Sequence, residues 1–376
     1  MRISNKYIIT YSLIVLFFVT GIFNGFIANE KPLICTLNGS IIFPVLDKDF
    51  RHEPAQKIIL RAPVKYSYYS VDIKNTGSVS PFATQNLEPG QQRHILGTDL
   101  YGRDVLAGMI YGTSIAMKVG LGSMILALVL GMLMSLFSSY FGDQGLKMKA
   151  GHLLILISGF ALLLYFLTYF DYFMSANDIS NILSFILLFL LMSRLLPLLP
   201  YFKRRINIPV DTGASVFTGV FQSMPSGFLI LILISLFAKT TLFNIILVIG
   251  LLKWPGIARY VRAEVLKVKQ ERFVEASKVL GLKDRLIIFR HILPYTFIPV
   301  FIALSYGFAG SILLESTLSF LGIGTPADHV SWGTLLGEAR QDFSAWWLAI
   351  FPGIAIFTMI FIFNRLGEKF SVYSNQ

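Results

Sequence analysis

The chain of 376 residues has a single cysteine, Cys35, and only 14% of its residues are charged. One cysteine excludes an internal disulfide. A soluble domain carries about a quarter of its residues as charged side chains, because these dominate exposed positions. The low hydrophobicity that disorder requires is also missing, since 55% of the residues are hydrophobic. The composition therefore indicates a polytopic membrane protein.

Sequence motifs for catalysis and for nucleotide binding are absent as well. The five histidines do not fall in HExxH or paired-ligand spacing, so a metal site is not expected. The chain contains neither a G-x-S-x-G nucleophile elbow nor a G-x-x-x-x-G-K-[ST] phosphate loop. We therefore expect no catalytic residue and no cofactor, and ATP is not bound by that loop.

Eight apolar runs are long enough to cross a bilayer core of about 30 Å as helices. They are residues 7–28, 119–141, 150–170, 179–200, 214–238, 241–258, 292–314 and 343–364. The first is interpreted as a retained anchor, because Ile27-Ala28-Asn29 is a poor signal-peptide cleavage site. The expected fold is an all-α integral membrane bundle of about eight helices. A small extracytoplasmic β-containing region is expected at Val64–Ile73, which is rich in β-branched and aromatic residues.

The net charge of +11 is placed unevenly along these runs. If the first of the eight spans starts on the inside, residues 259–290 lie in the cytosol. This segment has nine basic and four acidic residues. The outer loop 171–178 has two acids and no base, and 315–342 has four acids against Arg340. This positive-inside pattern predicts that both termini are cytosolic. Nucleic-acid binding is not expected, because the basic residues are spread over several inner loops beside apolar spans.

Residues 259–290 contain a pattern that predicts a docking helix. Phe273, Ala276, Ser277 and Leu280 fall at i, i+3, i+4 and i+7, which gives one apolar or small helical face. Gly281 supplies a left-handed stop, so we expect a short helix, a glycine hinge and a second helix. Such a helix can press into a groove on a soluble partner. The alternative is a basic loop that lies against an anionic leaflet.

The same loop resembles the "EAA" loop of ABC-importer permeases. Glu275-Ala276-Ser277 is followed after three residues by Gly281 and then by His291-Ile292-Leu293-Pro294. Ser277 replaces the second alanine, and His291 replaces an isoleucine in a way that is similar to the peptide-importer branch. The resemblance implies a coupling helix that docks on an ATPase subunit, with the surface formed by Phe273, Glu275, Ala276, Ser277, Leu280 and Gly281.

Two further segments are similar to the dipeptide/oligopeptide permeases of the C type. They are HILGTDLYGRDVL at 94–106 and ESTLSFLGIG at 315–324. The resemblance covers about 94–142 and 214–370, and 143–210 is then an inserted pair of helices in a family that usually has six. The implied outer-face signature residues are Gly97, Thr98, Asp99, Gly102, Arg103, Asp104, Glu315, Leu318, Ser319, Phe320, Gly322 and Gly324.

Several roles stay open for these outer residues. Asp99 and Asp104 either cap a helix entrance and pair with Arg103, or the turn contacts substrate, a binding protein or a sister permease. Glu315 is either a functional carboxylate or a solvated cap. The glycines of 322–324 allow a sharp re-entry of the chain. The tryptophans of this region are either interface-belt anchors or a ligand cage, namely Trp332, Trp346 and Trp347.

The resemblance implies a cell-membrane permease subunit of an ABC importer for short peptides. The implied partners are a second, B-type permease, two ABC ATPase subunits, an extracytoplasmic substrate-binding protein and the lipid bilayer. Import of nickel, other metal chelates or antimicrobial peptides is the alternative within transport, and a non-transporting membrane assembly anchor is the alternative outside it. The expected division of the chain is 1–28, 29–113, 114–142, 143–210 and 211–376.

Overall fold

The computed structural model describes residues 5–37, 40–46, 57–168, 187, 189–191, 204–237, 239–326 and 328–374. They form two compact units, Met134–Thr218 and the rest of the chain. The predicted outer loop 171–178 and nearly all of the predicted fourth span, 179–200, lie outside the described residues.

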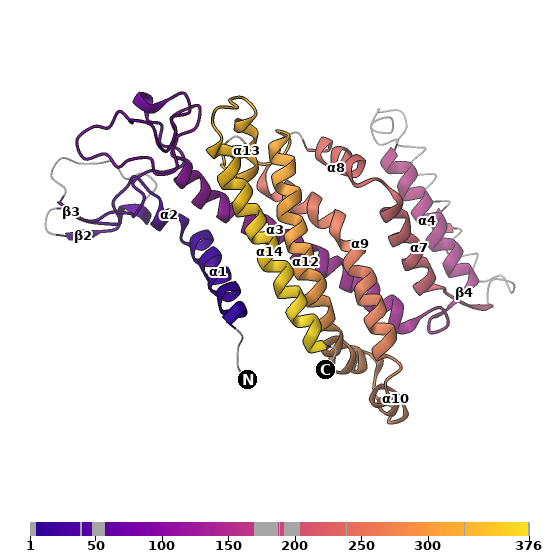
Figure 1. Cartoon of the computed structure of the whole chain (residues 1–376). Coiled ribbons are helices and arrows are strands. Elements are labelled where there is room, and N and C mark those ends of the chain that lie inside the picture. Colours follow the sequence, from indigo (N-terminus) through magenta and orange to yellow (C-terminus); the bar gives the residue numbers. More distant parts are fainter. Residues whose placement is uncertain are drawn as a thin grey trace, which may run out of the picture. The chain divides into compact units, whose positions relative to one another are not determined.

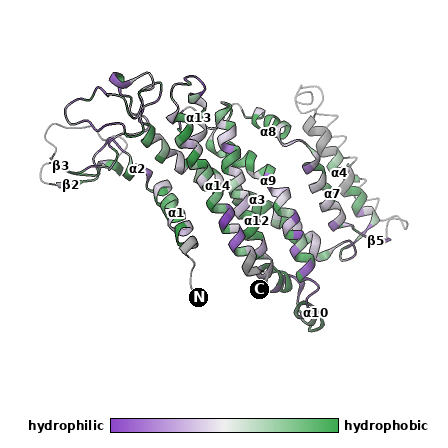
Figure 2. Cartoon of the chain, viewed as in Figure 1, coloured by the Kyte–Doolittle hydropathy of each residue, from purple (hydrophilic) through white to green (hydrophobic). Residues whose placement is uncertain are grey.

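Long apolar helices dominate the chain, as the composition predicts. Within the described ranges four helices are long and apolar enough to cross a membrane: Val105–Phe141, Leu242–Val268, Asp284–Phe320 and Trp347–Ser371. A fifth span is possible if the broken pair Val210–Ser223 and Ser226–Ser235 counts as one. Figure 2 shows hydrophobic residues along the length of these helices. The helical membrane class is therefore confirmed, and the number of eight spans stays a prediction.

The labelled elements of Figure 1 have the following bounds. The helices are α1 Asn5–Ile22, α2 Asn24–Ile27, α3 Val105–Phe141, α4 Ala150–Thr168, α7 Val210–Ser223, α8 Ser226–Ser235, α9 Leu242–Val268, α10 Arg272–Val279, α11 Asp284–Leu286, α12 Leu293–Phe320, α13 Trp332–Ala339 and α14 Trp347–Ser374. A π-helical turn, Ile287–Ile292, joins α11 to α12. Short 3-10 turns lie at Pro44–Leu46 and Ile73–Asn75.

Two predicted runs differ in extent from the helices of the structure. α3 begins at Val105 rather than at residue 119, so the predicted extracytoplasmic segment 29–113 ends in the first turns of this helix. The run 214–238 is not one helix, because it is interrupted between Ser223 and Ser226. Pro225 stands at the N-cap of α8, where a proline can begin a helix but cannot continue one.

The larger unit is built around α12, which lies beside α14 and α9 (Figure 1). Ile115 and Val119 of α3 pack against Ile245 and Ile249 of α9 in a buried apolar cluster. α10 lies at one end of this unit, whereas α13 lies at the other end, as Figure 1 shows. The membrane-spanning helices therefore separate two sets of short elements.

The segment before α3 contains a small sheet, but not where the composition suggests it. Strands β1 Ile34–Leu37, β2 Ser40–Ile42 and β3 Lys57–Leu60 form an antiparallel sheet of order β2-β1-β3. Val64–Ile73, the predicted β-rich segment, makes only isolated bridges. Its aromatic residues are used in packing instead, because Tyr68 lies in a core cluster and Tyr66 stacks on His94.

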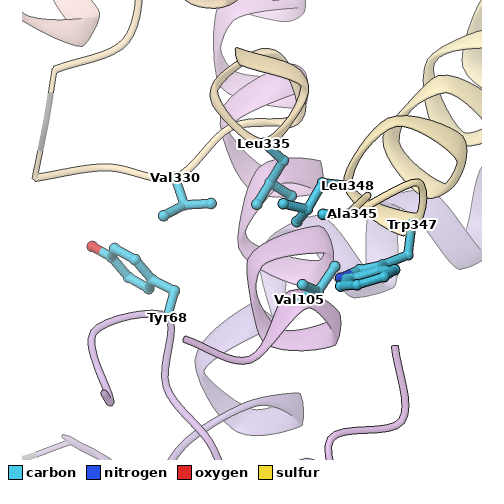
Figure 3. Close-up of a cluster of buried hydrophobic side chains, with 7 residues drawn as sticks. All are labelled: Tyr68, Val105, Val330, Leu335, Ala345, Trp347 and Leu348. Carbon is cyan, nitrogen blue, oxygen red and sulfur yellow. The ribbon is translucent and has the colours of Figure 1, made fainter. Parts of the chain in front are cut away.

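That core cluster joins the segment before α3 to the C-terminal helices. Figure 3 shows its seven side chains, Tyr68, Val105, Val330, Leu335, Ala345, Trp347 and Leu348. The indole N–H of Trp347 donates to the carbonyl of Thr98 at 3.0 Å. Trp332 is also buried and donates to the carbonyl of Met109 at 3.0 Å. Buried indoles with backbone partners are packing residues, so neither expectation for these two tryptophans was correct.

The smaller unit has its own short sheet. β4 Lys147–Lys149 pairs antiparallel with β5 Arg205–Asn207. Asp143 accepts hydrogen bonds from the N–H and the hydroxyl of Thr212. These contacts close the predicted insertion 143–210 at its base, so its two ends lie next to each other.

We predict that Trp347→Ala destabilises the larger unit by about 3–5 kcal/mol, because it leaves a buried cavity and removes the hydrogen-bond donor of the Thr98 carbonyl. Thermal unfolding in detergent measures the effect as a lower midpoint. Trp346→Ala is the matched control, because Trp346 is 39% exposed whereas Trp347 is 3% exposed. Equal shifts for the two variants would contradict this account.

Candidate functional site

The signature before α3 surrounds a buried charge cluster. The N–H of Ala107 donates to Oδ2 of Asp104 at 2.7 Å, so Asp104 caps the first turn of α3. Oδ1 of Asp104 lies 2.9 Å from Nδ1 of His94, and Oδ2 of Asp72 lies 3.3 Å from its Nε2. Carboxylates only accept hydrogen bonds, so this pair of contacts favours a ring that carries a proton on both nitrogens.

Burial and charge act in opposite directions on His94. The side chain is fully buried and stacks on Tyr66 at 4.2 Å. Burial alone lowers the pKa of His94, but the hydrogen bonds and charges of Asp104 and Asp72 outweigh it and raise the pKa above its usual value. Sequence reasoning missed His94, and the signal available was its place three residues before Gly97 in the signature.

A second ion cluster ties the signature to α13. Arg103 donates to Asp99 through Nε and to Glu338 through its guanidinium end. Asp99 also accepts from the backbone N–H groups of Tyr101 and Arg103, at 2.9 and 2.8 Å. Burial and the nearby Asp99 raise the pKa of Glu338 to about 7, although Arg103 acts in the opposite direction. Of the roles left open for this signature, these contacts match the one in which Asp99 and Asp104 cap the helix entrance and pair with Arg103.

The remaining members of this signature hold the turn. The hydroxyl of Thr98 donates to the carbonyl of Asn75 at 2.8 Å and accepts from the N–H of Val79 at 3.0 Å. Gly97 and Gly102 both have a positive φ, of 79° and 82°, which a glycine adopts without strain. The turn is therefore fixed by its own side chains and backbone.

A cavity of about 610 Å³ lies beside the Arg103–Glu338 pair. Tyr101 and Arg103 line it from the first signature, Ser319, Phe320 and Gly322 from the second, and Arg340 follows α13. The structure thus brings two motifs together that are about two hundred residues apart. Both carry residues expected at the outer face.

Glu315 is buried, and the expectation of a solvated cap was wrong. Its side chain is 1% exposed and accepts hydrogen bonds from the hydroxyls of Ser319 and Thr325, each at 2.8 Å. The chain turns back after Phe320, since the N–H of Thr325 reaches Oγ of Ser319 at 2.9 Å. The predicted re-entry at 322–324 is therefore present and covers Glu315. Leu318 is buried on the same helix.

The short helix predicted from the spacing is present, but its predicted face is divided. α10 spans Arg272–Val279. Ser277 is buried within the chain, and the ring of Phe273 packs against that of Tyr295 at 4.9 Å. Ala276 and Leu280 are exposed on the other side, where Leu280 is 79% exposed. The four residues therefore do not share one free face, because part of the helix is covered by the start of α12.

The exposed side of α10 contains one residue that the spacing did not select. Val279 is 87% exposed and adjoins Leu280, and Glu275 is exposed one turn earlier. Val274, which was not selected either, is fully buried and anchors the helix. An apolar tip of this kind on a loop outside the membrane-spanning helices is typical of a partner surface.

Gly281 ends α10 as predicted. It has a φ of +72°, its N–H donates to the carbonyl of Lys278, and the N–H of Leu282 donates to that of Ser277. This pair of bonds is a Schellman motif, which requires a left-handed residue after the helix. A Cβ at Gly281 would meet nothing within 4 Å, so the constraint is on the backbone alone. The second helix begins at Asp284.

Neither the signature region before α3 nor the loop around α10 has the character of a metal centre. In the part of the chain that the structure describes, no group of three His, Cys, Asp or Glu side chains is placed to hold a metal ion. The charge clusters instead consist of opposite charges that compensate one another.

Comparison with known proteins finds a family match in the C-terminal half of the chain. Residues 195–371 match the family of the binding-protein-dependent transport system inner membrane component. The oligopeptide transport system permease protein OppC of Haemophilus influenzae is 40% identical over 154 residues, which are 40% of this chain and 49% of that protein. The dipeptide transport system permease protein DppC of Alkalihalophilus pseudofirmus is 26% identical over 286 residues, covering 76% and 72%. The inner membrane ABC transporter permease protein YejE of Escherichia coli is 26% identical over 364 residues, covering 91% and 85%.

We predict that the stability contributed by His94 falls as pH rises. Because the folded pKa of His94 is raised, its contribution is fully present below the unfolded pKa of about 6.5 and is lost as pH passes the folded pKa. Thermal unfolding of wild type and His94→Gln is compared from pH 5.5 to 9. The midpoint difference is expected to be largest at low pH and to shrink at high pH. A difference that does not change with pH would refute the cationic assignment.

Proposed function

We propose, from the premise that residues 195–371 belong to the family of binding-protein-dependent transport system inner membrane components, that the chain is a permease subunit importing short peptides. ATP hydrolysis lies in partner subunits, because permeases of this kind carry no nucleotide site of their own. The observation that carries the proposal is the exposed apolar tip of α10. α10 lies at the end of the larger unit opposite α13 (Figure 1).

In this proposal α10 is the coupling helix. Ala276, Val279 and Leu280 press into a groove of an ATPase, and Glu275 pairs with a polar or basic group there. Val274 and Ser277 hold the helix on its own chain, and Phe273 does so through Tyr295. Gly281 sets the angle between this helix and the next. The burial of one side of α10 supports its role in holding the helix on its own chain, and the exposure of the other side supports its role in docking.

Short peptides are the proposed substrate class. Two of the three relatives described above are named for oligopeptide and dipeptide transport. These names favour peptides over nickel, metal chelates or antimicrobial peptides, and no contact in the described residues favours a chelate. A membrane anchor without transport would need no coupling helix, so the exposed tip of α10 argues against it.

The proposed complex has a second, B-type permease, two ABC ATPases and an extracytoplasmic substrate-binding protein. Substrate passes between the two permeases by alternating access, in which ATP-driven closure of the ATPases pulls the coupling helices together. On the outer face, Arg103 and Glu338 line the cavity, whereas Asp99 and Asp104 hold the turn. This arrangement supports a rigid turn beside the outer opening of the proposed transport path.

We propose eight spans with both termini in the cytosol. The basic loop 259–290 and α10 then lie on the cytosolic side, and the segment before α3 lies outside. Residues 143–210 form an inserted pair of spans, a proposal supported by the compact unit Met134–Thr218. An added pair leaves the sidedness of everything after it unchanged, so the six-helix core keeps its orientation.

Leu280→Asp is predicted to abolish co-purification of the ATPases, because it places a charge in the apolar contact. Gly281→Val is predicted to have the same effect through the backbone, while membrane insertion stays normal. Both are measured by pull-down of the complex from membranes and by peptide uptake. Leu46→Asp is the control, because Leu46 is 71% exposed and lies in the segment before α3. Normal assembly with normal uptake in Leu280→Asp would contradict the docking assignment.

A further inference from the structure

Lys253 lies in the middle of a membrane-spanning helix. It belongs to α9, Leu242–Val268, and is followed by the buried pair Trp254 and Pro255. Among the residues that the structure describes, no carboxylate is within ion-pair distance of its ammonium group and no hydrogen bond to it is formed. A cation at this depth is costly, so its place in a membrane helix calls for a partner.

The lysine faces a small pocket of about 260 Å³. Ser226 of α8 lines it, together with Leu252 of α9 and, from α12, Gly310, Leu313 and Thr317. A Cβ at Gly310 would lie 3.1 Å from Nζ of Lys253. The absence of a side chain at this position therefore leaves room for the ammonium group. All of these residues belong to the larger unit.

The polar groups of the pocket suit an anion. The ammonium group of Lys253 supplies up to three donors, and the hydroxyl of Ser226 supplies another. The hydroxyl of Thr317 already donates to the carbonyl of Leu313 at 2.8 Å, so it completes the wall rather than adding a donor. No acidic side chain lines the pocket. A cationic ligand would be repelled by the lysine, and a neutral one would leave it unpaired.

We propose that this pocket binds the C-terminal carboxylate of the peptide as it crosses the membrane. The inference rests on the proposed function, since every unmodified peptide carries this group. A carboxylate in the bilayer is as costly as the lysine, and pairing the two desolvated charges offsets both costs. The pocket is smaller than the 300–1,000 Å³ of sites that enclose a whole ligand, so it holds one end of the peptide. Leu252 and Leu313 contact the last side chain.

The test uses the complete importer in proteoliposomes, with its second permease, ATPases and binding protein. The probes are trialanine and trialanine amide, each at a concentration that saturates the binding protein. Uptake by Lys253→Met is divided by uptake by wild type for each probe, so that any preference of the binding protein cancels. We expect a loss of about tenfold or more for trialanine and a change within about twofold for the amide.

Matched variants separate charge from folding. Lys253→Arg is expected to keep uptake of trialanine within a few-fold, because it keeps the cation. Gly310→Ala places a methyl group against Nζ of Lys253 and is expected to lower uptake of trialanine but not of the amide. Lys118→Met is the control, because Lys118 is exposed on the membrane helix α3 and does not line the pocket.

Equal losses for both probes, or no loss for either, would overturn the carboxylate site. It is also overturned if Lys253→Met prevents co-purification of the second permease, since the lysine would then pair with a carboxylate of that subunit. Failure of the wild-type complex to import either peptide is a different result. It would overturn the proposed function and, with it, the inference.

Discussion

The carboxylate of Asp104 has two partners at the point where the chain enters the 37-residue helix α3. One oxygen accepts the N–H of Ala107 and so starts α3, and the other binds the buried ring of His94. Neither bond is replaceable by water, because Asp104 and His94 are buried. The turn that these bonds fix also presents the Thr98 carbonyl to Trp347 and Arg103 to Glu338. The start of α3 and its contacts with α13 and α14 therefore depend on these buried charges.

The opposite end of the larger unit is built differently. α10 is held on one side by Val274, Ser277 and the Phe273–Tyr295 contact, and its other side is exposed. From Asp284 the chain runs as one helical path to Phe320, next to the signature cavity. Gly310, beside the Lys253 pocket, and the buried Glu315 both lie on α12 along this path. The larger unit thus has a buried, charge-fixed turn at one end and an exposed apolar tip at the other.

The local parts of this arrangement could be predicted from sequence, and the parts that depend on distant contacts could not. Apolar runs located α9, α12 and α14, and Gly281 located the end of α10, because both signals are local. The exposed side of α10 could not be read from spacing, since contacts with residues outside the helix, such as that of Phe273 with Tyr295, cover the other side. His94 was missed because its partners Asp72 and Asp104 lie on either side of it, 22 and 10 residues away. The burial of Glu315 depends on a return of the chain that brings Thr325 to it.

The central claim is that this chain passes ATP-derived energy to a transport path that opens to a binding protein. The most direct measurement is the ATPase rate of the complete complex in reconstituted vesicles, with binding protein that is either empty or loaded with peptide. The account predicts that loaded binding protein stimulates hydrolysis several-fold over the empty form. A rate that is the same with loaded, empty or no binding protein would contradict it.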